Sequence, residues 1–241
     1  MSEDQKEYRF FTKADMDRIS EISFMTPIFD DMIAKYGFQS VLDYGCGNGI
    51  FGMYLKKQRG CYLVGVDGSE YGLRQAKELG YDRTIRIDDF CTQRLPLEDD
   101  SFDLVMLKDI LEHMTDPLFV LGEAARVLSE RGLLLIHVPN HFPLAYRIKF
   151  LFTNRIDTQN YFPDSKEWNF PHIRFFTMEG LEEMFDTVGL AAIENYSDHF
   201  TTFCPVIAHL PFSKKFHRYL AKRYPSQFSY GYTFLCKKKV S

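Results

Sequence analysis

The sequence lacks the features that mark membrane, secreted and zinc-binding proteins. No segment approaches the ~20 consecutive apolar residues of a membrane-spanning helix, and the N-terminus has no charged start followed by an apolar stretch. The five cysteines are widely spaced and contain no CxxC pair, a pattern that argues against a disulfide framework or a zinc site. We therefore expect a soluble cytoplasmic protein with free thiols and no bound metal ion.

Internal repeats and low-complexity tracts are also absent. A chain of 241 residues with 45% hydrophobic content can build one sizeable core but is too short for two full domains and a linker. We predict a single domain over residues 1–241. Apolar strands alternate with helical patterns, which indicates an α/β fold with a doubly wound parallel sheet. Ser69, Asp116 and Thr177 stand where N-caps of helices are expected.

The spacing of the glycines distinguishes between two classes of nucleotide cofactor. After the apolar stretch Val41–Leu42 comes a glycine-rich turn, in which Gly49 stands one residue too early for the G-x-G-x-x-G fingerprint of dinucleotide sites. Asp43 would repel a diphosphate but suits a cofactor that carries an ammonium and a sulfonium group. Asp67 ends the next apolar run, where a carboxylate can accept hydrogen bonds from both hydroxyls of a ribose. The pattern favours a cationic nucleoside cofactor, and a nucleotide-dependent oxidoreductase is the weaker alternative.

At these residues the chain resembles the class I S-adenosylmethionine (SAM)-dependent methyltransferases. Further matching segments follow the family's order from about residue 38 to 139, and they are Asp89-Phe90, residues 101–107, Leu111-Glu112-His113, residues 125–128 and residues 132–136. The resemblance implies a Rossmann-like, doubly wound, seven-stranded and mostly parallel sheet whose last strand, near 230–236, runs antiparallel.

The same resemblance divides the domain into four parts. The cofactor-binding core covers 38–139, and a helical cover precedes it over 1–37, where apolar residues between 14 and 36 have roughly helical spacing. A long aromatic and basic segment, 140–176, is expected to be a lid inserted after the fifth strand. A C-terminal helix and strands complete the domain over 177–241.

The resemblance also implies which residues hold SAM and its product S-adenosylhomocysteine. They follow the carboxyl ends of successive strands and are Asp43, Gly45, Cys46, Gly47, Asp67, Gly68, Asp89, Phe90, Leu107 and Lys108. The glycines would let the backbone approach the methionine moiety, and Asp67 would hold the ribose. Asp89 would accept from the adenine amino group, a role that the neighbouring Asp88 could also take.

Catalytic residues are harder to assign, because methyl transfer gains much of its acceleration from holding the two reactants in line. An acceptor that must lose a proton would still benefit from a base, and His113, His137, His141 and His172 are candidates. We select His113 and His172. The alternative is that His113 binds backbone at a helix end and that the loop carrying His172 serves packing.

Residues 140–225 resemble the MetW family of methionine biosynthesis. The matching residues are Val138-Pro139-Asn140, Arg147, Phe150-Leu151-Phe152, Arg155, Glu167-Trp168-Asn169, His172, Thr177 and Arg223-Tyr224-Pro225. Members of that family are linked to homoserine acyltransferases. The first function that we predict is methyl transfer to an O or N atom of a small polar metabolite. The alternative is a MetW-like partner protein of a biosynthetic acyltransferase, without turnover of its own.

Acidic residues disappear after residue 198, whereas eight lysines and arginines follow it, although the whole chain has a net charge of −4. Residues 214–223 could contact anionic lipid, a phosphate-bearing substrate or an acidic partner; the plain alternative is a solvated helix. The aromatic C-terminal third could supply a homodimer surface. No nucleic acid is expected, because the segment after the fourth strand lacks the Pro-Pro-aromatic signature that resembles base-amino methyltransferases.

Overall fold

The computed structural model of the chain describes residues 22–154, 166, 169–201 and 213–239. Within this part, the strands are β1 (Ser40–Tyr44), β2 (Tyr62–Asp67), β3 (Arg83–Arg86), β4 (Phe102–Lys108), β5 (Leu128–Pro139), β6 (Leu190–Asn195) and β7 (Gly231–Lys238). The helices are α3 (Ile22–Lys35), α4 (Ile50–Arg59), α5 (Glu70–Leu79), η2 (Leu111–His113), α6 (Pro117–Val127), α7 (Leu144–Thr153), α8 (Met178–Thr187), η4 (Ser197–His199), α9 (Ser213–Arg223) and α10 (Pro225–Phe228).

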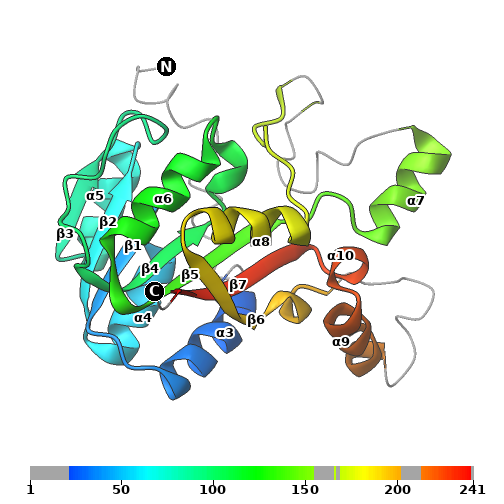
Figure 1. Cartoon of the computed structure of the whole chain (residues 1–241), viewed down its shortest axis with the longest axis horizontal. Helices are drawn as coiled ribbons and strands as arrows, with labels where there is room; N and C mark the ends of the chain where they lie inside the picture. Colours follow the sequence, from blue (N-terminus) through cyan, green and yellow to red (C-terminus); the bar gives the residue numbers. More distant parts are fainter. Residues whose placement is uncertain (1–21, 155–165, 167–168, 202–212, 240–241) are drawn as a thin grey trace.

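The described strands form one sheet in the order β3-β2-β1-β4-β5-β7-β6 (Figure 1). All neighbouring pairs are parallel except those of β7, which runs antiparallel to both β5 and β6. The predicted seven-stranded, mostly parallel sheet with an antiparallel last strand is therefore confirmed.

Each face of the sheet carries its own hydrophobic core. One core lies under α6 and α8 and includes Val105, Val120 and Phe185. The other lies under α3, α4 and α5 and includes Phe29, Leu55 and Leu73. Strands that are buried on both faces need continuous apolar runs, which is what β1, β2 and β4 have.

Local signals in the sequence place several helix ends. The side chains of Ser69, Asp116 and Thr177 each accept a hydrogen bond from an amide in the first turn of α5, α6 and α8, as the sequence predicts. α3 supplies the helical cover of the sheet, and its expected N-terminal part before residue 22 lies outside the described residues. β5 begins at Leu128 and not at Gly132, because Leu128 pairs with Phe102 of β4 across a register shift.

The described helices include none that is both long and apolar enough to cross a membrane. Cys46, Cys61, Cys91 and Cys236 are free thiols. The fifth cysteine, Cys204, lies outside the described residues.

Candidate cofactor and catalytic site

The candidate site lies where the strand order reverses. β1 and β4 are neighbours in the sheet although they are not consecutive in the chain, so the loops that follow them leave in opposite directions. Such a switch point opens a crevice at the carboxyl ends of parallel strands. The glycine-rich turn after β1 and the η2 segment after β4 both lie at this switch point.

The turn after β1 requires glycine at Gly49. Its φ is +83°, and a Cβ there would come within 2.9 Å of the Ala76 backbone and 2.6 Å of the Tyr81 ring. Gly45 also has a positive φ, +86°, but a Cβ there would meet only the Ile110 side chain. Because they lack side chains, Gly49 lets the turn approach Ala76 of α5, and Gly45 lets it approach Ile110.

Asp67 connects the glycine-rich turn to the end of β2. The amide of Gly47 donates to its Oδ2 at 2.7 Å, and the amide of Ser69 donates to its Oδ1 at 2.9 Å. Burial raises the pKa of the Asp67 carboxyl, and the amides of Ser69 and Gly47 oppose that rise. A carboxylate with two oxygens can accept further hydrogen bonds, so Asp67 is oriented and still able to accept from ligand hydroxyls.

Asp43 is buried behind the turn, with 4% of its surface exposed. The Tyr81 hydroxyl donates to Asp43 Oδ2 at 2.6 Å and also lies 3.0 Å from the Gly49 carbonyl oxygen. Burial raises the pKa of Asp43 to about 6, although the Tyr81 hydrogen bond works in the opposite direction. Asp43 therefore holds the glycine-rich turn from within, and its influence on a ligand would pass through this turn.

Phe90 lies beside Gly68. The Phe90 ring stacks on Tyr44 at a centroid distance of 5.3 Å, and a Cβ on Gly68 would lie 3.6 Å from the Phe90 ring. Asp89 turns its carboxylate toward its own loop, where it accepts from the Cys91 amide and the Thr92 hydroxyl. Asp88 lies 3.0 Å from Arg86.

The end of β4 brings a lysine into an aromatic setting. Lys108 Nζ lies 4.3 Å from the centroid of Phe51 on α4 and forms an ion pair with Asp109. Leu107, the preceding residue, is fully buried in the sheet. The side chain of Lys108 thus ties the end of β4 to the first turn of α4.

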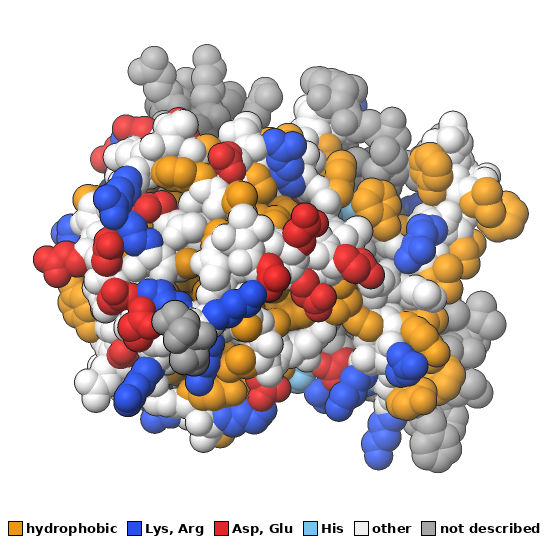
Figure 2. Space-filling view, in the orientation of Figure 1, with side chains coloured by type: hydrophobic (Ala, Val, Ile, Leu, Met, Phe, Trp, Pro, Cys, Tyr) orange, Lys and Arg blue, Asp and Glu red, His pale blue; other side chains and the backbone are white. Residues whose placement is uncertain are grey.

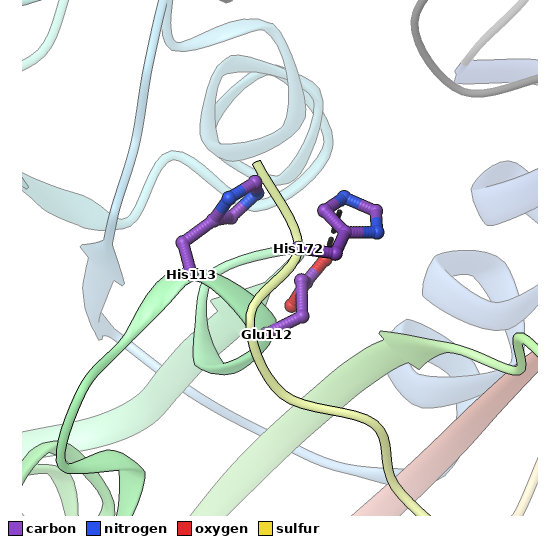
Figure 3. Close-up of side chains that lie close together, drawn as sticks. All are labelled: Glu112, His113 and His172. Atoms are coloured by element: carbon purple, nitrogen blue, oxygen red, sulfur yellow. Dashed lines mark ion pairs between the residues drawn. The ribbon is translucent and has the colours of Figure 1, made fainter. Parts of the chain in front are cut away.

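Two histidines and one glutamate lie close together beyond the end of β4 (Figure 3). The 171–174 segment is pinned on η2, because the amides of Ile173 and Arg174 both donate to the Glu112 carbonyl oxygen. This contact places His172 Nε2 3.9 Å from Glu112 Oε1, the pair that Figure 3 joins with a dashed line. The ring centroids of His172 and His113 are 4.8 Å apart.

Hydrogen bonds orient these imidazoles. His113 Nδ1 lies 3.1 Å from the Pro171 carbonyl oxygen. A carbonyl can only accept, so Nδ1 carries the proton and Nε2 carries the lone pair. His172 Nδ1 lies 2.7 Å from Nε2 of His141, which follows β5. Burial lowers the pKa of all three imidazoles. The pKa falls to about 4 for His141 and to about 3 for His172, and it is also lowered for His113.

Glu112 has the least favourable electrostatic environment in the cluster. Its side chain is fully buried, and within the described residues neither carboxylate oxygen has a hydrogen-bond partner. Burial raises the pKa of Glu112 well above its ordinary value, and Asp109 adds to the rise. Burial thus disfavours the charged forms of both Glu112 and His172. The ligand atoms of Glu112, His113 and His172 lie within 4.8 Å of one another, a spacing that could hold a proton or a divalent cation.

Known proteins share this core. Residues 42–136 match the family described as "Methyltransferase domain". Over these residues the chain is similar to methyltransferase domains. A ubiquinone biosynthesis O-methyltransferase of Hahella chejuensis is 31% identical to it over 131 residues, which cover 53% of this chain and 55% of the relative. An uncharacterized protein of Haemophilus influenzae is 34% identical over 117 residues, 45% of this chain and 47% of the relative. The chain therefore matches about half the length of these relatives.

Solved structures agree with the methyltransferase fold over nearly the whole chain. A Pyrococcus horikoshii protein superposes with a TM-score of 0.62 at 19% identity and covers 99% of this chain and 100% of its own. A possible histamine N-methyltransferase of Thermotoga maritima gives a TM-score of 0.58 at 18% identity, with 92% and 96% coverage.

The fold brings many of the predicted site residues together. Gly45, Cys46 and Gly47 lie against Val66 and Asp67 at the end of β2, and His113 lies beside His172. The lid predicted over 140–176 is described only in part; its α7 packs against α10, and residues 155–165 and 167–168 lie outside the described residues.

Two contributors to the site were missed in the sequence. Tyr81 approaches Asp43 from 38 residues away, and no local pattern marks it apart from the helix-ending Gly80 before it. Glu112 stands in the Leu111-Glu112-His113 motif, where an acid between apolar neighbours was a signal of burial. His141 was a candidate base and is instead the residue that holds His172.

Proposed function

We propose that this chain transfers the methyl group of SAM to an oxygen or nitrogen atom of a small polar metabolite. The observation that carries the proposal is the Asp67 carboxylate, which the amides of Gly47 and Ser69 orient at the end of β2. A ribose would find an acceptor for its hydroxyls there, and the buried Asp43 behind the glycine-rich turn would disfavour a diphosphate at that turn. The match of residues 42–136 to the methyltransferase domain supports the same cofactor.

The residues present fit SAM, which supplies a methyl group activated by a positive sulfonium. In our proposal Asp67 holds the ribose, and Gly68 and Phe90 border the adenine, with Asp89 as an acceptor for the adenine amino group. Gly45, Cys46 and Gly47 approach the methionine moiety through their backbone, as do Leu107 and Lys108. Asp43 keeps the glycine-rich turn in place through Tyr81 and contributes negative charge behind it.

On the acceptor side, His113 is the proposed base. The Pro171 carbonyl fixes its Nδ1–H, so Nε2 can take the proton that an acceptor hydroxyl or amine releases as its new bond to the methyl carbon forms. The pKa of His172 is lowered to about 3 by burial, which makes it a poor proton acceptor. We therefore assign His172 to positioning the acceptor, with His141 holding its ring.

Calorimetric titration tests the cofactor. We expect micromolar binding of SAM and S-adenosylhomocysteine, about −8 kcal/mol, and no binding of NAD. Asp67→Ala should abolish adenosyl binding, because the acceptor for the ribose is lost, while Glu78→Ala, which removes an exposed carboxylate of α5, serves as the control. Binding of NAD in place of SAM would overturn the proposal. A screen of small acceptors, read as S-adenosylhomocysteine release, then identifies the substrate.

A partner-dependent role is the second candidate. One structural neighbour, a putative methyltransferase of Haloferax volcanii, was solved in complex with the Trm112 methyltransferase activator, at a TM-score of 0.58 and 19% identity. A MetW-like role of this chain would combine SAM binding with no turnover on any acceptor and with co-purification of an acyltransferase. Turnover by the isolated chain would exclude it.

A further inference from the structure

α7 is a helix without a buried residue. Leu144, Ile148, Leu151 and Phe152 have the i, i+4, i+7, i+8 spacing of one apolar face. In a globular protein such a face packs on the core, yet Leu151 is 77% exposed, Phe152 81% and Ile148 48%. The apolar face of α7 therefore points away from the protein.

Basic residues flank this face on both sides. Successive residues of a helix are 100° apart, which puts Arg147 on one side of the apolar face and Lys149 on the other. Arg147 is held in place by hydrogen bonds to the Phe142 and Ser226 carbonyl oxygens, and no carboxylate neutralises it among the described residues. An apolar face between cations is typical of helices that lie in the plane of an anionic membrane surface.

α9 adds a second basic and aromatic face at the same end of the molecule. It turns His217 and Ala221 inward and leaves Phe216 49% and Tyr219 65% exposed. Lys215, Tyr219 and Lys222 have the i, i+4, i+7 spacing of its outer face. α10 packs against both α7 and α9, and Figure 1 draws the three helices together beyond β7.

Negative charge is scarce over this end. The sequence has no acidic residue from 138 to 156 or from 199 to 241. Asp198 of the neighbouring η4 is only 13% exposed and pairs with Arg218 at 2.9 Å. In Figure 2 the side chains drawn over α7, α9 and α10 are hydrophobic or basic, while the acidic ones lie over the rest of the visible face.

We propose that α7 and α9 dock this chain on the surface of an anionic phospholipid bilayer. Leu151 and Phe152 enter the acyl boundary, and Arg147, Lys149, Lys215 and Lys222 contact the phosphates of the headgroups. A second copy of the chain is a poorer occupant, because a twofold contact would press two cationic faces together. The proposal does not depend on methyl transfer, and its test measures binding alone.

Vesicle flotation of the full chain tests the docking. We expect binding to phosphatidylcholine vesicles that contain about one third phosphatidylglycerol, weak binding to pure phosphatidylcholine, and weaker anionic binding at high salt. The double substitution Leu151→Asp and Phe152→Asp should reduce vesicle affinity at least tenfold. Lys215→Glu with Lys222→Glu should reduce both the affinity and its dependence on salt.

Matched controls lie on the opposite part of the sheet. Leu79→Asp changes a leucine of α5 that is 42% exposed, and Lys57→Glu with Lys77→Glu removes two exposed lysines from α4 and α5. Both should bind vesicles as the unchanged chain does. Absence of anionic binding, or equal binding by the α7 variant, overturns the proposal. A dimer that the α7 variant converts to a monomer in sedimentation velocity also overturns it, since the face is then covered by a second copy.

Discussion

Gly49 is the residue at which the cofactor turn can least tolerate a side chain. Gly49→Ala should destabilise the fold by roughly 2 kcal/mol or more, because its left-handed φ adds to a collision with the Ala76 backbone. SAM affinity should fall with it. Urea unfolding and calorimetry measure the two effects.

Gly122 supplies the control for that substitution. It lies in α6, and a Cβ there would have no heavy atom within 4 Å. Gly122→Ala should leave stability unchanged or raise it by up to ~1 kcal/mol, owing to the better helix propensity of alanine. Equal losses in the two variants would refute the steric explanation at Gly49.

Substitution of His113 tests its proposed role as the base. Once an acceptor is known, His113→Asn should lower kcat by roughly 10²–10⁴-fold while the SAM dissociation constant stays unchanged. The acid limb of the pH–rate profile, which reports protonation of this imidazole, should disappear. His172→Asn should instead raise KM for the acceptor. An unchanged kcat in the His113 variant would show that positioning alone accounts for the reaction.

At the scale of elements, the N-cap of α8 can be tested by mutation. This cap, Thr177, directly follows the segment that carries His172. The Thr177 hydroxyl accepts from the Gly180 amide at 3.0 Å, so Thr177→Ala should cost about 1 kcal/mol in the free energy of unfolding. Thr187 at the other end of α8 donates to the Glu183 carbonyl oxygen. Thr187→Ala should change stability by less than ~0.5 kcal/mol. Similar losses at both ends would contradict a specific cap at Thr177.

These caps also show what the sequence can reveal. Ser69, Asp116 and Thr177 bind amides three residues ahead, so the local sequence contains all of the information. Asp43 and Tyr81, by contrast, meet only because β1 and β2 pair and α5 ends beside them. The contact of Glu112 with His172 likewise depends on how the 171–174 segment lies on η2. The seven-stranded, mostly parallel sheet with its antiparallel strand was predictable from a family resemblance, whereas these long-range pairs needed the packed molecule.

At the scale of the whole molecule, buried histidines couple stability to pH. His137 is 6% exposed and bonds Thr233 across the β5–β7 pair at 2.7 Å. Burial lowers its pKa from 6.5 to about 4, against the raising effect of Asp109. A histidine with a lowered folded pKa contributes stability that is complete above pH 6.5 and is lost as the pH falls toward the folded pKa.

The expected loss from His137 is up to about 1.4 kcal/mol per pH unit below its unfolded pKa. His137→Gln should therefore show a shallower fall in unfolding free energy between about pH 6.5 and about pH 4.5, whatever its stability at neutral pH. Asp43 has the opposite effect on the pH dependence, because its raised pKa of about 6 stabilises the folded state at lower pH. Asp43 is present in both proteins, so its contribution drops out of the difference between their unfolding free energies. Parallel curves from urea unfolding would contradict this role of His137.

The position of β7 determines when the sheet can be completed during synthesis of the chain. β6 joins the described sheet only through β7, which separates it from β5. On a ribosome, Leu190–Asn195 therefore emerges several seconds before Gly231–Lys238, at ~5–20 residues per second. During that interval the edge of β5 stays bare, and a bare edge invites pairing with another chain. The β5 edge is thus where a nascent copy would recruit a chaperone or begin to aggregate.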